Sequence, residues 1–231
     1  MIALRLLGRR TVGGIRRLNP DRFYGIKGGM TTEMPGLIQL WYRFENWLAE
    51  HAGEDYASLL PGASDDEIRR LEDGLGFPLR EDVKGMIRLH DGVTERRSSK
   101  QPGAFLLGYS LLGVDGIISS HRDLVSMVEN SREEGDEESV VGRIADERWV
   151  PLAQDITGDL LFVDHRHHYA GEIGEMSFGD PEYRMLWPRM DLMLEDLCNS
   201  VENRTPITSV PRIPYVHEGR MLEWHVQGVQ R

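Results

Sequence analysis

Residues 60–92 read LPGASDDEIRRLEDGLGFPLREDVKGMIRLHDG, and this stretch predicts two helices with defined ends. Ser64 and Glu67 have the spacing of a capping box, in which each side chain pairs with a free backbone N–H at the start of a helix. Apolar residues then recur at helical spacing, which is typical of one buried face. We expect the first helix to stop at Gly76 and the second, after a proline-containing extended link, to stop at Gly92.

The same apolar periodicity predicts helices on both sides of this stretch. It occurs over residues 37–48, 117–128 and 190–201. Pro35 falls near the first turn of the earliest of these helices, where its missing N–H costs nothing. Helices therefore precede and follow the central part of the chain.

Strands are predicted mainly between these helices. Residues 105–109, 149–152 and 159–164 are short apolar runs, and residues 171–176 alternate as a strand with one wet face does. The short connections between the last three favour antiparallel pairing. Helices, then strands, then a helix indicate an α+β fold, which we expect to be a single domain with a mainly antiparallel sheet flanked by helices.

We expect this domain to cover residues 30–203 and to be followed by a C-terminal tail, residues 204–231. Within the tail, residues 213–216 and 221–224 flank a short polar segment that contains a Glu-Gly pair. This pattern predicts a hairpin, which we expect to pack on the domain.

The first 29 residues differ in charge from the rest. They carry seven Lys/Arg and one Asp, a balance of +6, whereas residues 30–231 carry 20 Lys/Arg and 37 Asp/Glu, a balance of −17. No apolar periodicity links residues 1–29 to the domain, so we expect a disordered basic leader. Two accounts of it remain open: an organellar transit peptide, or an over-extended reading frame ahead of a native start at Met30.

The composition disfavours several classes of function. An acidic body repels phosphate, so no nucleic-acid partner is expected. The single cysteine, Cys198, excludes an internal disulfide, and its place beside a helical apolar stripe predicts a buried, inert thiol. No apolar run reaches the roughly 18 residues that span a bilayer, so we expect a cytoplasmic protein with no membrane partner.

The one candidate metal site lies in residues 164–168, DHRHH. Two histidines spaced H-x-H on a strand point to one side, and a metal-dependent hydrolase could use Asp159, Asp164, His165 and His167 together. The sequence marks no further ligand for a catalytic zinc, and the alternative interpretation is a polar turn between two strands. No nucleotide-binding loop is present, and no cofactor is expected.

Two segments resemble signatures of the SUKH superfamily of Smi/Knr-like proteins. The first is residues 60–92, and the second comprises residues 149–155 and 158–164. The tail around Pro214 and residues 222–224 is similar to that of bacterial members. We interpret the residues that carry the resemblance as structural: Pro61, Glu67, Leu71, Glu72, Pro78, Leu79, Asp91, Gly92, Trp149, Pro151, Asp155, Gly158, Asp159 and Asp164.

The resemblance spans residues 35–226 and implies an α+β fold, with a sheet flanked by helices and no enzymatic activity. Bacterial members are implicated as immunity proteins that neutralise toxins, often nucleases, delivered by competing cells. Fungal members regulate cell-wall glucan synthesis through protein contacts. Arg80 departs from the family pattern, which often has a second proline there, and this bears only on a helix start. The acidic insert at residues 133–138 is another departure.

We therefore expect a protein-binding domain without catalytic activity, and our first hypothesis is an immunity-type protein that neutralises a secreted toxin, such as a nuclease. An acidic face would cover the toxin's basic active site. The alternatives are an intracellular regulatory scaffold of the cell-wall-synthesis-regulator type and a metal-dependent hydrolase. Partner-contact candidates are Trp47, which lies off the apolar stripe of its helix, and the acidic residues Glu133, Glu134, Asp136, Glu137 and Glu138. The acidic run is equally compatible with a solvated loop that contacts nothing.

Overall fold

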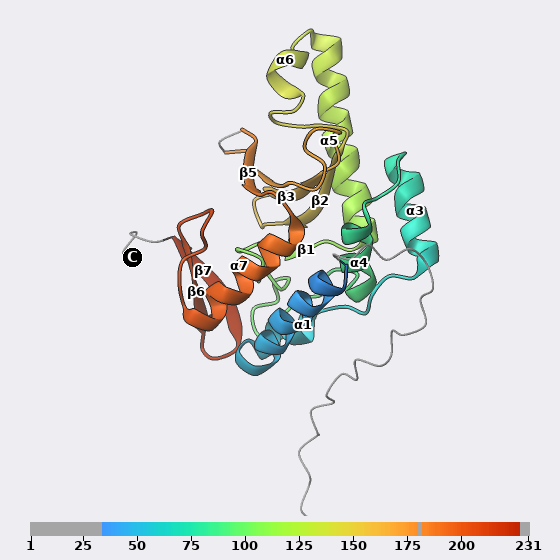
Figure 1. Ribbon diagram of the computed structural model, residues 1–231. Coiled ribbons are helices and arrows are strands. Elements are labelled where there is room, and N and C mark those ends of the chain that lie inside the picture. The colour runs from blue at the N-terminus through green and yellow to red at the C-terminus, as the bar shows by residue number, and fades with distance from the viewer. Residues whose placement is uncertain (1–33, 180–181, 227–231) are drawn as a thin grey trace, which may run out of the picture. The chain divides into compact units, whose positions relative to one another are not determined.

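The computed structural model describes residues 34–179 and 182–226, and the expected leader at 1–29 lies outside them (Figure 1). The described residues form an α+β fold of seven helices with a five-stranded antiparallel sheet and a two-stranded hairpin. The helices are α1 Met34–His51, α2 Gly53–Ser58, α3 Asp65–Leu75, α4 Glu81–Leu89, α5 Val114–Glu134, α6 Glu137–Val140 and α7 Met190–Asn203. The strands are β1 Ser110–Leu111, β2 Trp149–Gln154, β3 Leu160–Asp164, β4 Ile173–Met176, β5 Arg184–Trp187, β6 Arg212–His217 and β7 Met221–Val226. Of the helices in these residues, none is long and apolar enough to cross a membrane.

Helix α3 has the ends that the sequence predicts, whereas α4 ends at Leu89, three residues before the predicted stop at Gly92. Ser64 N donates to Glu67 Oε2 at 2.7 Å and Glu67 N donates to Ser64 Oγ at 3.3 Å, which confirms the capping box. Helix α3 ends at Gly76, whose φ of 78° is left-handed. Gly92 follows α4 with a φ of 82°, and a side chain there would collide with the backbone of Gly113. Glycine is therefore required at position 76, where α3 ends, and at position 92, shortly after α4.

The five-stranded sheet is a meander in the order β1-β2-β3-β4-β5, with every neighbouring pair antiparallel. Strand β3 lies at its centre, and all of its residues are buried. Because side chains alternate along a strand, the two faces of β3 serve two cores. Leu161 and Val163 belong to the larger core, whereas Phe162 stacks on Trp149 in the smaller one, with ring centroids 4.1 Å apart.

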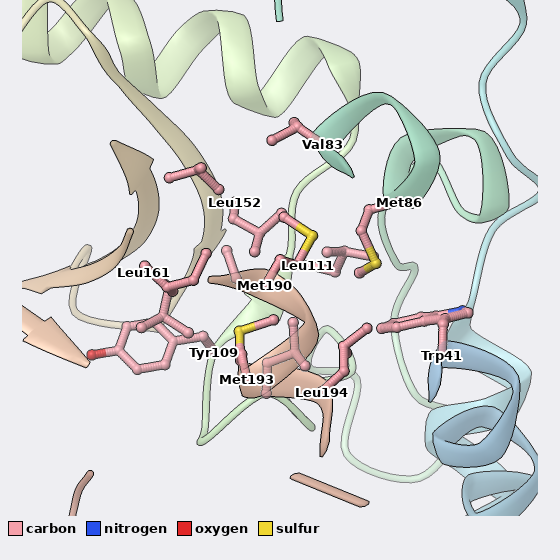
Figure 2. Packing of buried hydrophobic residues seen from close by; sticks show 14 of the residues in the cluster. Trp41, Val83, Met86, Tyr109, Leu111, Leu152, Leu161, Met190, Met193 and Leu194 are labelled. Atoms are coloured by element: carbon pink, nitrogen blue, oxygen red, sulfur yellow. The ribbon is translucent and has the colours of Figure 1, made fainter. Parts of the chain in front are cut away.

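Helices cover both faces of this sheet, as expected. Helix α5 packs on β2, and its Leu124 and Val128 close the smaller core over Trp149. On the other face, α1, α4 and α7 supply the larger core, where Figure 2 shows Met190 of α7 between Leu161 and the start of α4. Helix α1 also packs along α7 (Figure 1).

The predicted C-terminal hairpin is confirmed. Strands β6 and β7 pair antiparallel, with Tyr215 opposite Glu223. The inner face of the hairpin packs on the larger core: Leu222 is fully buried, and Trp224 Nε1 donates to the carbonyl oxygen of Phe105 at 2.8 Å. The hairpin therefore closes one side of that core.

Two strand predictions are wrong in detail. Residues 105–109 form a buried turn, because Leu107 and Gly108 have left-handed φ values of 56° and 93°, and Leu106 bridges back to Tyr109. The sequence also predicts one wet face for β4, yet all of its residues are buried, because Ile173 lies in the larger core, Met176 lies in the smaller one and its one charged side chain is ion-paired. Strand β5 was not predicted at all.

Candidate protein-interaction site

The predicted acidic contacts gather at the end of α5 and on α6, and we call them the acidic surface (Figure 1). They are Glu133, Glu134, Asp136, Glu137 and Glu138, and all five are exposed. The prediction of a loop is wrong here, because α5 continues through Glu134 and α6 begins at Glu137. Gly135 separates the two helices with a left-handed φ of 77°. Two helix ends therefore hold these acids on an ordered frame.

Arg132 lies within the acidic surface and neutralises part of it. Its guanidinium donates to Glu137 Oε1 at 3.1 Å and to Glu147 Oε1 at 2.6 Å. The hydrogen bond from Arg132 lowers the pKa of Glu147, which keeps that carboxylate ionised. Of the five acids of this surface Arg132 pairs with Glu137, so the surface stays acidic.

Trp47, the other predicted contact, is partly withdrawn from solvent. Its ring packs against the larger core and lies 4.9 Å from the ring of His51, measured between centroids. It is carried by α1, which lies far from α6 (Figure 1). The structure therefore does not bring Trp47 and the acidic surface together.

The first motif, residues 60–92, joins the ends of helices to neighbouring elements through hydrogen bonds. Glu72 Oε1 accepts from the backbone nitrogen of Leu79 at 2.8 Å and lies 2.8 Å from Lys84 Nζ. Asp91 Oδ1 accepts from the backbone nitrogen of Val114 at 2.6 Å, which joins the end of α4 to the start of α5. Of its other members, Leu71 is buried, Pro78 is exposed in the α3–α4 link, and the Pro61 carbonyl accepts from Asp91 N at 3.0 Å; Trp149 and Pro151 of the second motif are buried.

The second motif builds the turn between β2 and β3. Asp155 Oδ1 accepts from Thr157 N and Thr157 Oγ1 at 2.8 Å each, and from Asp159 N at 2.9 Å. Gly158 has a φ of 96°, which other residues rarely adopt. Asp159 Oδ1 in turn accepts from the backbone nitrogen of Phe178 at 2.9 Å. The two carboxylates bind this turn internally and connect it to the loop after β4.

Asp164 lies fully buried at the other end of β3. It accepts from Trp149 Nε1 at 3.1 Å, from Arg166 N at 2.8 Å and from Arg166 Nη2 at 2.6 Å. The Arg166 guanidinium lies 4.6 Å from the ring centroid of Tyr169 and 5.5 Å from that of Tyr183. All of these partners hold the carboxylate in place.

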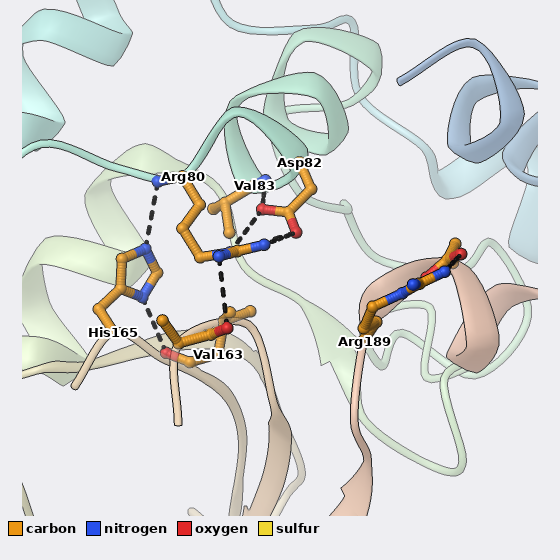
Figure 3. A network of polar contacts seen from close by, with 8 residues as sticks. Arg80, Asp82, Val83, Val163, His165 and Arg189 are labelled. Carbon is orange, nitrogen blue, oxygen red and sulfur yellow. Dashed lines mark hydrogen bonds and ion pairs between the residues drawn. The ribbon is translucent and has the colours of Figure 1, made fainter. Parts of the chain in front are cut away.

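His165 is also fully engaged, as Figure 3 shows. Its Nδ1 donates to the Val163 carbonyl at 3.1 Å, and its Nε2 accepts from Arg80 N at 3.3 Å. Burial lowers the pKa of His165, which favours this neutral form. The one lone pair that a neutral imidazole offers a metal, on Nε2, is therefore taken by Arg80 N.

The candidate metal residues do not converge. Asp159 and Asp164 stand at opposite ends of β3, and five steps along a strand span about 16 Å. His167 is exposed, with its ring 5.1 Å from that of His168. In the part of the chain that the structure describes, no three His, Cys, Asp or Glu side chains are grouped to hold a metal ion. The geometry corresponds to the polar turn, not to a hydrolase centre.

Arg80 does more than the sequence suggested. It is the N-cap of α4, and its guanidinium donates to Asp82 Oδ2 at 2.9 Å and to the Ala170 carbonyl at 3.3 Å (Figure 3). It thereby links the start of α4 to the β3–β4 turn.

Sequence reasoning missed a buried polar network beside the hairpin. Glu175 of β4 is 2 % exposed and accepts from Tyr109 Oη at 2.6 Å and from Arg212 Nη2 at 3.0 Å; it also pairs with Arg184. Burial and the Glu175 carboxylate raise the pKa of Tyr109, so its hydroxyl stays a donor. An isolated Glu in a strand carries no sequence signal of such partners.

Cys198 is not placed as a nucleophile. It is fully buried in α7, and burial raises the pKa of its thiol to about 11. The neutral thiol donates to the Leu40 carbonyl at 3.4 Å. The prediction of a buried thiol is confirmed.

Comparison with known proteins agrees with this geometry. The sequence model of the SMI1 / KNR4 family (SUKH-1) matches residues 62–196, which is more than half of the chain. The cell wall biosynthesis/cell cycle regulator smi1 of Schizosaccharomyces pombe is 27 % identical over 165 residues, covering 64 % of this chain and 32 % of that protein. The KNR4/SMI1 homolog of Kluyveromyces lactis is 28 % identical over 90 residues, covering 39 % of this chain and 17 % of that protein. The chain thus spans a third or less of these relatives.

Proposed function

This chain belongs to the SMI1/KNR4 family (SUKH-1), and we propose that it works by binding a partner protein and has no catalytic activity of its own. The observation that carries the proposal is the exposed acidic surface, on a body whose residues 30–231 have a charge balance of −17. Such a field attracts a basic partner and repels an acidic one. The absence of catalysis in this proposal is supported by the candidate metal residues, because Asp159, Asp164 and His165 make internal hydrogen bonds.

The partner that we propose is a toxin with a basic active site, such as a nuclease delivered by a competing cell. A nuclease must attract phosphate, so its cleft carries Lys and Arg side chains. The acidic surface would bind over that cleft and exclude the substrate. We place this encounter in the cytoplasm, which suits a chain whose one cysteine is free and buried.

A second candidate is a regulatory scaffold of cell-wall synthesis. The printed names of both relatives favour it. In that case the chain would correspond to one binding module of a longer regulator. A neighbouring gene for a large secreted toxin favours the first candidate, and an isolated gene favours the second.

Affinity capture with the wild-type chain tests the proposal. The captured protein is purified and assayed alone and with an excess of the chain. We expect a basic toxin whose activity falls to background when the chain is added. A component of cell-wall synthesis would support the second candidate instead. Failure to capture any protein, or hydrolysis of a substrate by the chain itself with a divalent metal, would contradict the proposal.

A further inference from the structure

The tip of the β2–β3 turn carries an apolar side chain almost entirely in solvent. Ile156 is 85 % exposed, although turn positions are usually taken by Gly, Pro, Asn, Asp or Ser. Phe178, in the loop after β4, is 50 % exposed. The two belong to one end of the sheet, because a methyl group on Gly158 would lie 3.6 Å from Phe178 Cε2. One exposed apolar residue needs no explanation, but two on neighbouring loops at one end of the sheet form a small patch.

Internal hydrogen bonds fix the backbone of the two loops that carry this patch. The three donors to Asp155 close the turn on both sides of Ile156, and Asp155 N also donates to the Asp159 carbonyl at 3.0 Å. The bond from Phe178 N to Asp159 fixes the second apolar residue relative to the first. A loop whose backbone is already fixed loses less conformational entropy when a partner binds it.

The charge beside the patch specifies what it fits. The carboxylates of Asp155 and Asp159 flank the apolar tip, and the body that carries them is strongly acidic. A second copy of this chain would bring like charges together. A pocket that accepts Ile and Phe matches the apolar patch, and a rim of Lys, Arg or backbone N–H groups matches the carboxylates beside it.

We propose that Ile156 and Phe178 are the apolar anchor by which this domain docks into an apolar pocket with a basic rim on its partner protein. The inference rests on the proposed function and names the contact that holds the complex together. The acidic surface would speed the encounter, whereas the anchor would slow dissociation, because buried apolar contacts dominate the stability of most interfaces.

The test uses the full chain and the partner captured by the wild type, with affinities measured by biolayer interferometry. We expect Ile156→Asp to weaken binding by about tenfold to a hundredfold, mainly through faster dissociation, since an apolar side chain loses its burial and a charge enters the pocket. Phe178→Ser should weaken it by about tenfold. Ile156→Leu keeps an apolar side chain and should stay within about threefold of wild type.

Leu192→Ser is the matched control, because Leu192 is an apolar residue exposed at 38 % on a different element, α7. Circular dichroism and the melting temperature should be unchanged for Ile156→Asp, since that side chain has almost no neighbours to lose. Wild-type affinity in Ile156→Asp, with a partner still bound, would overturn the anchor and leave the binding function intact. A wild-type chain with no partner would overturn both.

Discussion

The carboxylate of Asp55 accepts a 2.6 Å hydrogen bond from the backbone nitrogen of Leu222, which lies 167 positions later in the chain. Asp55 is fully buried in α2, and its Oδ1 accepts from Arg96 Nε at 2.7 Å. Burial raises the pKa of Asp55, and the Arg96 charge opposes that shift. One buried acid therefore joins α2, the loop before β1 and the C-terminal hairpin.

Asp55→Ala is expected to destabilise the fold by about 3–5 kcal/mol, because it leaves Arg96 buried without its counter-charge. Leu222 N would also lose its acceptor. Chemical denaturation measures the loss, and hydrogen exchange of the hairpin amides shows whether β7 opens first.

The control replaces the whole pair. Asp55→Leu combined with Arg96→Met removes both charges and should recover most of the stability that Asp55→Ala loses, since an apolar pair of similar size often matches a buried ion pair. A double variant as unstable as the single one would show that the hydrogen bond to Leu222, not the ion pair, carries the effect.

Contacts between residues far apart in sequence, such as Asp55 and Arg96, could not be predicted from the sequence. The two ends of α3 were predictable because a cap and a glycine act within a few residues, as Ser64 and Gly76 do. Asp55 and Arg96 stand 41 residues apart, and nothing near either one in sequence indicates the other. Residues 105–109 were misread for a related reason. A short apolar run indicates that these residues are buried, but it does not distinguish a buried turn from a strand.

The site was predictable to a similar extent. Exposure of the acidic run follows from its composition, whereas the pairing of Arg132 with Glu147 depends on where the chain returns after α6. The H-x-H spacing suggested a metal site, but Arg80 N, which is distant in sequence, donates a hydrogen bond to Nε2 of His165. The exposure of Ile156 was not predicted, because it depends on the geometry of the β2–β3 turn.

Stability should fall on acidification through His165. Its pKa lies below the ordinary value of 6.5 because of burial. A depressed pKa means that the contribution of the neutral ring is present above about pH 6.5 and is lost as pH falls through the folded-state pKa. Protonation would also set an Nε2–H against the Arg80 N–H that now binds it.

The measurement is the melting temperature from about pH 7 to about pH 5, for wild type and His165→Gln. The wild type should lose more stability over this range than the variant. His121, whose pKa burial also lowers, still titrates in the variant, so a residual slope is expected, and His121→Gln is the matching second variant. Identical slopes for wild type and His165→Gln would rule out the role of His165.

Asp159→Ala should lower the free energy of unfolding by about 0.5–1.5 kcal/mol, because Phe178 N loses a hydrogen bond that water only partly replaces. Asp123→Ala, an exposed acid on α5, is the control and should stay within about 0.5 kcal/mol of wild type. Thermal or denaturant unfolding measures both. If Asp159→Ala kept full stability and abolished a hydrolytic activity, an enzyme would replace the binding protein proposed above.

The acidic surface should control association more than dissociation. Its five carboxylates are exposed, so each one alone contributes little to a bound complex. Together they act over the Debye length, which shrinks from about 30 Å at 0.01 M salt to about 8 Å at 0.15 M. Replacing all five by Ser should therefore slow association at low salt by about tenfold or more and leave the dissociation rate nearly unchanged.

Stopped-flow association with the captured partner, at several salt concentrations, measures this effect. The charge-matched control replaces five exposed acids elsewhere by Ser, namely Glu50, Asp73, Glu95, Asp123 and Glu195. That variant has the same net charge, so a smaller loss of association rate would assign the steering to the position of the acids at the end of α5. Equal losses in both variants would mean that overall charge is sufficient. An association rate that does not change with salt in the wild type would refute electrostatic capture, because screening must weaken any attraction between opposite surface charges.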